Sequence, residues 1–575
     1  MDIGSNAAVD MPIPDRFGAN AFEEDGEFEA LLRLYLPEEL LQHLRPHLLR
    51  LGELAGGPLD ALANTADQHP PTLEHRTRTG VDQQRILKHP AYVEMERLAF
   101  GEFGLAAMSH RAGVLGWPAT MPAAAKYAMT YLFVQAEFGL CCPLSMTDSL
   151  SRTLRKFGTP ELVERYLPAL LTQDLDGLAQ GAMFMTEQGA GSDIAATATM
   201  AHRDGDTWKL TGDKWFCSNP DAALAMVLAR VEGAPEGMRG VSLFLLPRTR
   251  QDGTPNAYRI IRLKDKLGTR SMASGEIRLE GATAYLVGEL GRGFVQMADM
   301  VNNSRLSNGV RAAGMMRRAA AEALFIARHR KAFGRRLVDM PLMKRQLAKI
   351  MLPGEQARTM MFQAADALRR SDSGDAAAYP LVRILTPMLK FRACRDARRV
   401  TGDAMEVRGG CGYIEEWSDP RLVRDAHLGS IWEGTSNIVA QDVIRAIVRE
   451  SSLEVLREHL KGLLQRSRIH AAVEAQLSGL FERACKLAET AAQAGGDGLA
   501  RQAASGLYHA TSAIAMAWEA SASGSARRMV LAQLVVRHRL MPRDPMQADP
   551  DEGLDLLLGD DLPRLDPAQV NLLQA

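Results

Sequence analysis

The sequence predicts a mainly α-helical protein with a central antiparallel β domain and an extra helical region at its C-terminus. Three observations support this fold class. Apolar residues recur at three- and four-residue spacing over most of the chain, which is typical of amphipathic helices. From Gly181 to about residue 290 the pattern changes to short alternating or apolar runs separated by turns, as expected for strands. After Gly293 the helical spacing returns and continues to the C-terminal region.

Five segments follow from these changes of pattern. Thr159-Pro160 predicts a helix start, because Thr can cap a helix and Pro is favoured at the first helical position. Thr207 to Thr211 alternates and precedes a Gly-Asp turn, which indicates a strand. Residues 541–565 are rich in Pro and Asp and are expected to form a loop or tail. The predicted segments are an N-terminal extension at 1–55, a helical domain at 56–180, the β domain at 181–292, a helical domain at 293–450 and a C-terminal helical extension at 451–575.

The composition is ordinary for a soluble globular protein. The chain has 575 residues, 46% of them hydrophobic and 24% charged, which excludes a disordered chain and a single small module. Lys and Arg number 68 against 69 Asp and Glu, so the whole chain lacks the basic character of a nucleic-acid binder, although a local patch is compatible with this balance. The six cysteines show no CxxC spacing, which argues against a metal site and a disulfide framework.

The location follows from the same features. The first 22 residues lack a long apolar run, so no signal peptide is expected. Charges interrupt every apolar stretch before 18 residues, so we expect no membrane span. With reduced cysteines, these features favour a cytoplasmic protein.

Two motifs of the β domain could line a ligand site. Gly181 to Asp193 is an apolar strand that opens into a Gly-rich turn, where backbone can approach a ligand closely. Lys214 to Asn219 places two aromatic residues before the hydroxyl of Ser218, which could line a flat ring system. Taken alone, the first motif is more simply a β-turn and the second a core strand with a polar end.

Two further motifs lie in the helical domain. Arg330 ends a predicted helix and can reach an anion such as a pyrophosphate, with Phe333 as a packing anchor. A basic helix C-terminus capped by Gly334 explains the same residues without a ligand. Glu433 lies between an aromatic residue and a glycine, just before a predicted helix and after a Gly-rich segment at 409–413. A Glu in this place is often a solvated capping residue, but its apolar context also suits a general base.

In this order, the four motifs make the sequence resemble the acyl-CoA dehydrogenase family, flavoproteins that desaturate acyl-CoA thioesters. The resemblance covers about residues 90–450 and is carried by Met185-Thr186-Glu187, Arg330 with Phe333-Gly334, Gly409-Gly410 and Trp432-Glu433-Gly434-Thr435. It implies a helix–β–helix architecture, FAD as cofactor, acyl-CoA as substrate and an electron-transferring flavoprotein as acceptor. Segments such as 214–216 and 431–434, with the extra C-terminal helices, look closest to the AidB-like, alkylation-response branch.

The resemblance also implies roles for single residues. Glu433 matches the catalytic base, which removes the α-proton while the flavin accepts the β-hydride. Ser192 and Arg305 match substrate-binding positions. Three of the cofactor-binding matches, Arg330, Phe333 and Gly410, imply contacts to the FAD of a neighbouring subunit and therefore a dimer or tetramer. The full set of cofactor-binding matches is Met185, Thr186, Ser192, Ser218, Arg330, Phe333, Gly410, Thr435 and Asn437.

Four positions depart from the family pattern. Phe216 stands where many members have Trp, and Ala332 replaces a frequent Thr. Pro341 and Glu406 stand where Gln residues near FAD are common, and a carboxylate at position 406 would repel a phosphate.

Two other functions stay open. In the AidB-like branch the C-terminal helical region is associated with duplex DNA binding, and dehydrogenase activity is weak. Residues 451–575 hold 13 Lys and Arg against 15 Asp and Glu, a net charge of −2, so charge does not favour DNA as a partner. A local basic run exists nevertheless, at Arg527, Arg528, Arg537, Arg539 and Arg543. The third possibility is a catalytically silent interaction scaffold.

Overall fold

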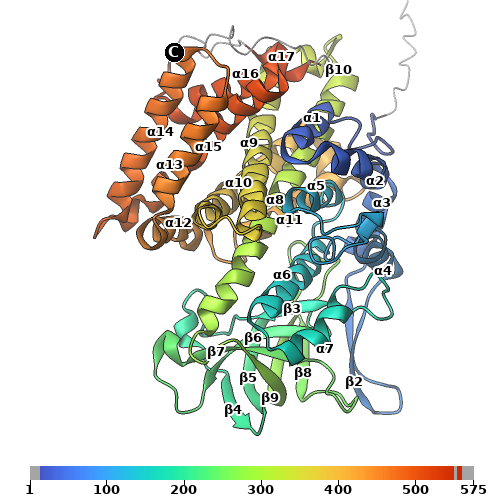
Figure 1. Cartoon of the computed structure of the whole chain (residues 1–575). Helices are drawn as coiled ribbons and strands as arrows, with labels where there is room; N and C mark the ends of the chain where they lie inside the picture. The colour runs from blue at the N-terminus through green and yellow to red at the C-terminus, as the bar shows by residue number, and fades with distance from the viewer. Residues whose placement is uncertain (1–12, 549–552, 560–575) are drawn as a thin grey trace, which may run out of the picture.

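The seven-stranded central sheet lies at one end of the molecule, and helices that precede and follow it in the chain make up most of the rest, as Figure 1 shows. The computed structural model describes residues 13–548 and 553–559. Thr159 caps α7 by accepting a hydrogen bond from Leu162 N, as predicted from the Thr-Pro pair. A β-hairpin of β1 (Thr72–Arg76) and β2 (Asp82–Leu87) interrupts the N-terminal helices. These helices are α1 (Gly26–Tyr35), α2 (Glu38–Gly56), α3 (Pro58–Gln68), α4 (Pro90–Glu96), α5 (Ala123–Phe133), α6 (Cys141–Phe157) and α7 (Pro160–Leu170).

The central sheet is mixed, which corrects the prediction of an antiparallel one. Both β3 and β4 pair in parallel with β6, whereas the other pairings are antiparallel. Because β7 pairs along one edge of β6, β3 and β4 occupy successive parts of its other edge and run in the same direction. The long Gly-rich connection between them keeps that direction, where a tight turn would have produced an antiparallel hairpin. The strands are β3 (Gly181–Phe184), β4 (Met200–Asp204), β5 (Thr207–Ser218), β6 (Leu224–Val231), β7 (Val241–Pro247), β8 (Tyr258–Leu263) and β9 (Ser274–Val287).

The helix–β–helix order is confirmed by a long helical bundle after the sheet. At Gly314 of α8, a Cβ would lie only 2.6 Å from the Tyr131 carbonyl oxygen, so glycine lets α8 approach α5 closely. A short hairpin of β10 (Lys331–Ala332) and β11 (Arg335–Arg336) follows α8. The helices are α8 (Gly293–His329), α9 (Pro341–Asp372), α10 (Ala378–Arg408), α11 (Ser418–Gly429) and α12 (Ser436–Glu450).

The C-terminal helices pack against the rest of the molecule through the same core as the N-terminal ones. Buried apolar residues from Ala21 to Leu558 belong to one continuous cluster. Part of the segment 541–565, expected to be loop or tail, lies outside the described residues, and the part at Leu554–Leu558 is helical. These helices are α13 (Ser452–Arg466), α14 (Ala471–Ala492), α15 (Ala500–Ser523), α16 (Ala526–Val535) and α17 (Leu554–Leu558). Within the described ranges, no helix combines the length and apolar character that crossing a bilayer requires.

A buried carboxyl group, Asp425 of α11, joins the helical bundle to the loop between β8 and β9. Thr269 N donates to Asp425 Oδ1 at 2.6 Å. Burial, followed by the nearby Glu137 carboxylate, raises the pKa of Asp425 to about 7. The carboxyl group therefore titrates in a range where an exposed aspartate is fully ionised.

We expect Asp425 to make the free energy of unfolding fall as the pH rises from about 4 to about 7. Because the folded pKa lies above the unfolded one, the native state binds more protons in this window, and the stabilisation present below it is lost across it. Asp425→Asn keeps the acceptor for Thr269 N and removes the titration. Denaturant unfolding at several pH values should give a flatter profile for the variant, and parallel profiles would contradict this assignment.

Candidate active site

Glu433 lies in the turn that leads into α12. Its φ of 55° is left-handed, which is uncommon for a residue with a side chain. Ser304 of α8 donates a hydrogen bond to Oε1, whereas Oε2 is buried and has no hydrogen-bond partner among the described residues. One carboxylate oxygen is thus oriented by the protein, and the other remains available to accept a proton from a ligand.

Two cations hold three consecutive carbonyl groups of this turn. Arg305 Nε donates to Glu433 O at 2.9 Å, and Lys390 Nζ donates to Trp432 O at 2.9 Å and also to Gly434 O. A left-handed residue with a side chain is disfavoured by about 1–2 kcal/mol. These contacts therefore stabilise a backbone that the sequence alone would not prefer.

Arg305, predicted as a substrate-binding residue, has its guanidinium group directed into the protein. In addition to its bond to Glu433 O, its Nη1 pairs with Asp442 of α12 at 2.7 Å. The geometry favours a positioning role for Arg305. Sequence reasoning missed Ser304 and Lys390, because both are distant in sequence from Glu433. It missed Asp442, on the helix that follows Glu433, because Asp442 belongs to no recognisable motif.

Aromatic and cation–π contacts to Trp432 stabilise the turn that carries Glu433. The rings of Trp432 and Phe138 stack with centroids 5.7 Å apart. The guanidinium group of Arg311 lies 4.8 Å from the centroid of Trp432 and is completely buried. Such a cation–π contact fixes the residue that precedes Glu433.

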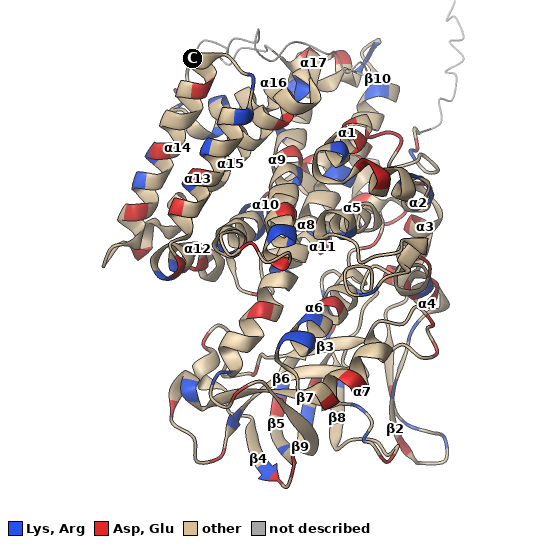
Figure 2. Cartoon of the chain, viewed as in Figure 1, with Lys and Arg blue, Asp and Glu red and all other residues tan. Residues whose placement is uncertain are grey.

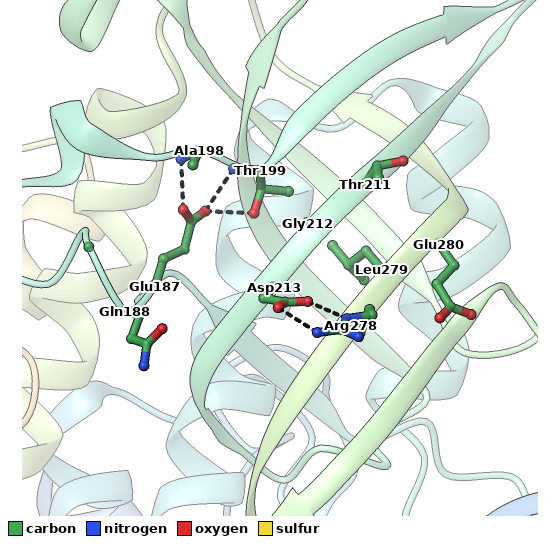
Figure 3. A pocket seen from close by; sticks show the side chains of 11 residues that line it. Glu187, Gln188, Ala198, Thr199, Thr211, Gly212, Asp213, Arg278, Leu279 and Glu280 are labelled. Carbon is green, nitrogen blue, oxygen red and sulfur yellow. Dashed lines mark hydrogen bonds and ion pairs between the residues drawn. The ribbon is translucent and has the colours of Figure 1, made fainter.

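The Gly-rich motif follows β3 and borders a hollow of about 440 Å³, shown in Figure 3. The Glu187 carboxylate accepts hydrogen bonds from the backbone N–H groups of Ala198 and Thr199, as Figure 3 shows. Its Oε1 also pairs with buried Lys214 Nζ at 2.6 Å. This ion pair anchors the Gly-rich loop. Met185 and Thr186, at the start of the loop, are half-buried, and Ser192, further along it, is exposed.

The second β-domain motif lies beside the first. Trp215 N donates to Thr186 O at 2.8 Å, so the start of the Gly-rich loop and the end of β5 are adjacent. Phe216 is 58% exposed, and Ser218 is half-buried. The structure therefore brings Thr186 and Ser218 into one region with an exposed aromatic side chain, which suits a flat ring system with hydrogen-bonding edges.

Three further predicted cofactor contacts, Arg330, Phe333 and Gly410, form a separate region at the far end of α8. Arg330 Nη1 donates to Arg408 O at 3.1 Å, next to Gly409 and Gly410. Phe333 is 95% exposed, at the tip of the β10–β11 hairpin. Ser304 and Arg330 are separated by most of α8, about 40 Å at 1.5 Å per residue. Figure 1 likewise shows β10 and the sheet at opposite ends of this helix.

Thr435 and Asn437 lie at the N-terminal end of α12, directly after Glu433. Both are exposed, and Thr435 makes no side-chain capping hydrogen bond. The free N–H groups of such a helix end favour a negatively charged group. Over the described parts of the chain, no cluster of three or more His, Cys, Asp or Glu side chains is arranged to hold a metal ion.

Comparison with known proteins assigns the family. Acyl-CoA dehydrogenase family member 11 of Caenorhabditis elegans is 30% identical over 494 residues, which are 82% of this chain and 79% of that protein. This chain belongs to the acyl-CoA dehydrogenase family. Three family models match it in order: the adaptive response protein AidB N-terminal domain at 13–177, the acyl-CoA dehydrogenase middle domain at 182–282 and the acyl-CoA dehydrogenase C-terminal domain at 291–448.

Two further comparisons place this acyl-CoA dehydrogenase near AidB and give its fold. The protein AidB of Escherichia coli (strain K12) is 34% identical over 407 residues, 68% of this chain and 72% of that protein. The crystal structure of Caenorhabditis elegans ACDH-11 in complex with C11-CoA superposes with a TM-score of 0.86 at 27% identity and covers 93% of this chain and 94% of that one. The predicted family and branch are confirmed.

Members of this family are FAD-dependent flavoenzymes, and the side chains of this acyl-CoA dehydrogenase fit that cofactor. Thr186 and Ser218 offer hydroxyl groups beside an exposed ring, and Arg330 offers a cation for a diphosphate. Glu406 is exposed on α10, so a carboxylate at this unusual position is free to turn into solvent. The other departures also lie near the surface, with Ala332 in β10 and Pro341 at the start of α9.

Proposed function

We propose that this acyl-CoA dehydrogenase desaturates an acyl-CoA thioester at its α and β carbons, with Glu433 as the base. The observation that carries the proposal is the pair of unequal oxygens on Glu433, one bonded to Ser304 and one buried without a protein partner. Oε2 removes the α-proton and keeps it, while Ser304 holds the carboxylate in place. FAD, when bound, supplies the acceptor for the β-hydride.

The proton that Glu433 removes is only weakly acidic, so the enolate oxygen that forms needs hydrogen-bond donors. We propose the backbone N–H of Glu433 as one of them. Trp432 and Phe138 exclude water from one side of the turn, which strengthens electrostatic contacts within the site. Met185, Thr186, Ser192 and Ser218 would hold FAD on the side of the β domain.

The relative that binds C11-CoA supports an acyl-CoA substrate for this chain as well. We further propose a homo-oligomer, a dimer or a tetramer, because one chain keeps Arg330, Phe333 and Gly410 far from the β-domain half of the cofactor site. A second copy could bring these residues to that half. An electron-transferring flavoprotein as acceptor and a cytoplasmic location complete the proposal.

The proposal is tested by anaerobic addition of acyl-CoAs of graded chain length to the FAD-loaded enzyme. At least one of them should bleach the absorbance of the oxidised flavin, because a completed dehydrogenation reduces it. Complete absence of bleaching at full flavin content would refute the proposed activity.

Similarity to AidB favours one alternative, a DNA-associated protective flavoprotein with little dehydrogenase activity. The local basic run that motivated it offers less than its sequence suggests. Arg527 and Arg528 are buried and paired with Glu27 and Glu355. Figure 2 shows acidic and basic residues interspersed along α13, α14 and α15. A surface of mixed charge releases few counterions on meeting phosphates.

We therefore expect the full-length protein to give no specific gel shift with duplex DNA at physiological salt. At low salt, any gel shift of duplex DNA should be weak and should be the same for duplexes of unrelated sequence. A shift with a Kd below about 1 µM at physiological salt, tighter than ordinary non-specific binding, would support the alternative instead.

A further inference from the structure

We infer that Lys390 is a positioning residue for the reaction, because its contacts to Trp432 O and Gly434 O fix the direction in which the backbone N–H of Glu433 points. The inference rests on the proposed function of Glu433. It assigns a role to a buried lysine of α10 that belongs to no motif of the sequence.

The argument starts from the geometry of a single peptide unit. In a planar trans peptide, the C=O of one residue and the N–H of the next point in opposite directions. Lys390 Nζ holds Trp432 O at 2.9 Å, so the N–H of Glu433 points away from Lys390. No acceptor within the described parts of the chain takes up this N–H. It is thus a free donor attached to the residue that carries the base.

The contacts to the neighbouring carbonyl groups keep this peptide from rotating. Arg305 Nε holds Glu433 O, and Lys390 Nζ also holds Gly434 O. The turn is therefore fixed on both sides of the left-handed residue. If Lys390 released Trp432 O, the peptide between Trp432 and Glu433 could flip and turn the N–H toward the protein.

The charge of Lys390 adds a second effect. Lys390 is buried, and its described side-chain partners are the carbonyl groups of Trp432 and Gly434, with no ion pair to a described carboxylate. Burying an unpaired charge costs free energy, so a lysine with only a packing role would not be favoured here. A cation bonded to a carbonyl polarises the whole amide, which makes its N–H a stronger donor. The charge also favours a negative charge that develops nearby, as on an enolate oxygen.

The surroundings of Lys390 set its response to pH. Burial lowers the pKa of Lys390 to about 8, and the cations Arg305 and Arg311 act in the same direction, while Cys394 and Glu433 oppose it. Lys390 therefore begins to lose its charge in mildly alkaline solution. This titration separates Lys390 from Arg305, which contacts the same turn and remains charged.

The test measures proton abstraction without hydride transfer. The probe is 3,3-dimethylbutyryl-CoA, which has α-hydrogens and no β-hydrogen, so the holoenzyme in deuterium oxide can exchange its α-protons but cannot oxidise it. NMR follows the exchange. Wild-type enzyme should exchange the probe, and Glu433→Gln should not. Wild-type enzyme that binds the probe without exchanging it would refute the proposed function of Glu433, an outcome distinct from failure of the Lys390 inference.

Lys390→Met should slow the exchange by about 100-fold, the lower end of the effect of losing one oxyanion donor, with the Kd of the probe within about threefold of wild type. Lys88→Met is the control, because it makes the same chemical change at a half-buried lysine that pairs with Glu96 and makes no described contact with the Glu433 turn, and it should exchange normally. Wild-type exchange by Lys390→Met, or equal losses of rate and affinity, would overturn the inference.

A second variant keeps the inference testable if Lys390→Met does not fold. Exchange by the wild-type enzyme should fall as the pH rises through about 8, the pKa of Lys390. Lys390→Arg stays charged at every accessible pH, so it should retain exchange and lack this fall. The same fall in wild type and Lys390→Arg would overturn the role of Lys390.

Discussion

Glu433→Gln should lower the rate of acyl-CoA dehydrogenation by about 10³-fold, within the range of general acid–base catalysis, and leave FAD content unchanged. An amide has nearly the shape of the carboxylate and can still accept from Ser304 Oγ. It cannot take up a proton from carbon at neutral pH. The loss should therefore appear in the rate of flavin reduction and not in the binding of acyl-CoA.

The control is Glu458→Gln, which makes the same chemical change at an exposed position on α13. It should reduce its flavin as fast as wild type does. A catalytically silent scaffold would lose nothing in either variant, so equal behaviour of the two would contradict the role of Glu433. Rapid-mixing absorbance measurements with a single acyl-CoA distinguish these outcomes.

The second large effect concerns stability. Arg528→Met should lower the free energy of unfolding by about 3–5 kcal/mol, because it removes one member of a buried ionic network. Arg528, 1% exposed, pairs with Glu355 at 2.7 Å and with Glu519. Although burial alone would raise it, Arg358, Arg527 and Arg528 lower the pKa of Glu355 to about 2. Glu355 is thus ionised, and the variant would remove one of the buried cations that pair with it and with Glu519.

This network joins both ends of the chain to the central bundle. Arg358 of α9 pairs with Asp25, next to α1, at 2.7 Å, and Arg527 of α16 pairs with Glu27 of α1 at 2.7 Å. Denaturant-induced unfolding measures the effect. The control is Arg483→Met, which makes the same change at an exposed residue of α14. A loss below about 1 kcal/mol, the size expected for a surface ion pair, would show that the network contributes little.

Sequence patterns predicted those parts of the protein that depend on neighbouring residues. The periodicity of apolar residues gave the order of helices and strands, and Glu433 was recognisable because Trp432 and Gly434 adjoin it. The directions of β3 and β4 were not predicted, because the alternation of residues in a strand does not show which strand it pairs with or in which direction.

Long-range contacts account for the rest. Lys390 and Glu433 meet only because α10 packs beside the turn before α12. Arg527 and Arg528 belonged to a run that suggested a basic surface, yet their partners Glu27 and Glu355 lie 500 and 173 residues away. No local pattern distinguishes a buried arginine with distant partners from a solvated one.

The most direct test of the central claim is the anaerobic reaction of the FAD-loaded enzyme with saturated acyl-CoAs and their α-deuterated forms. Glu433 as the base predicts that an acyl-CoA of suitable length bleaches the flavin and that deuterium at the α-carbon slows this bleaching. Full flavin occupancy with no bleaching at any chain length would contradict the account.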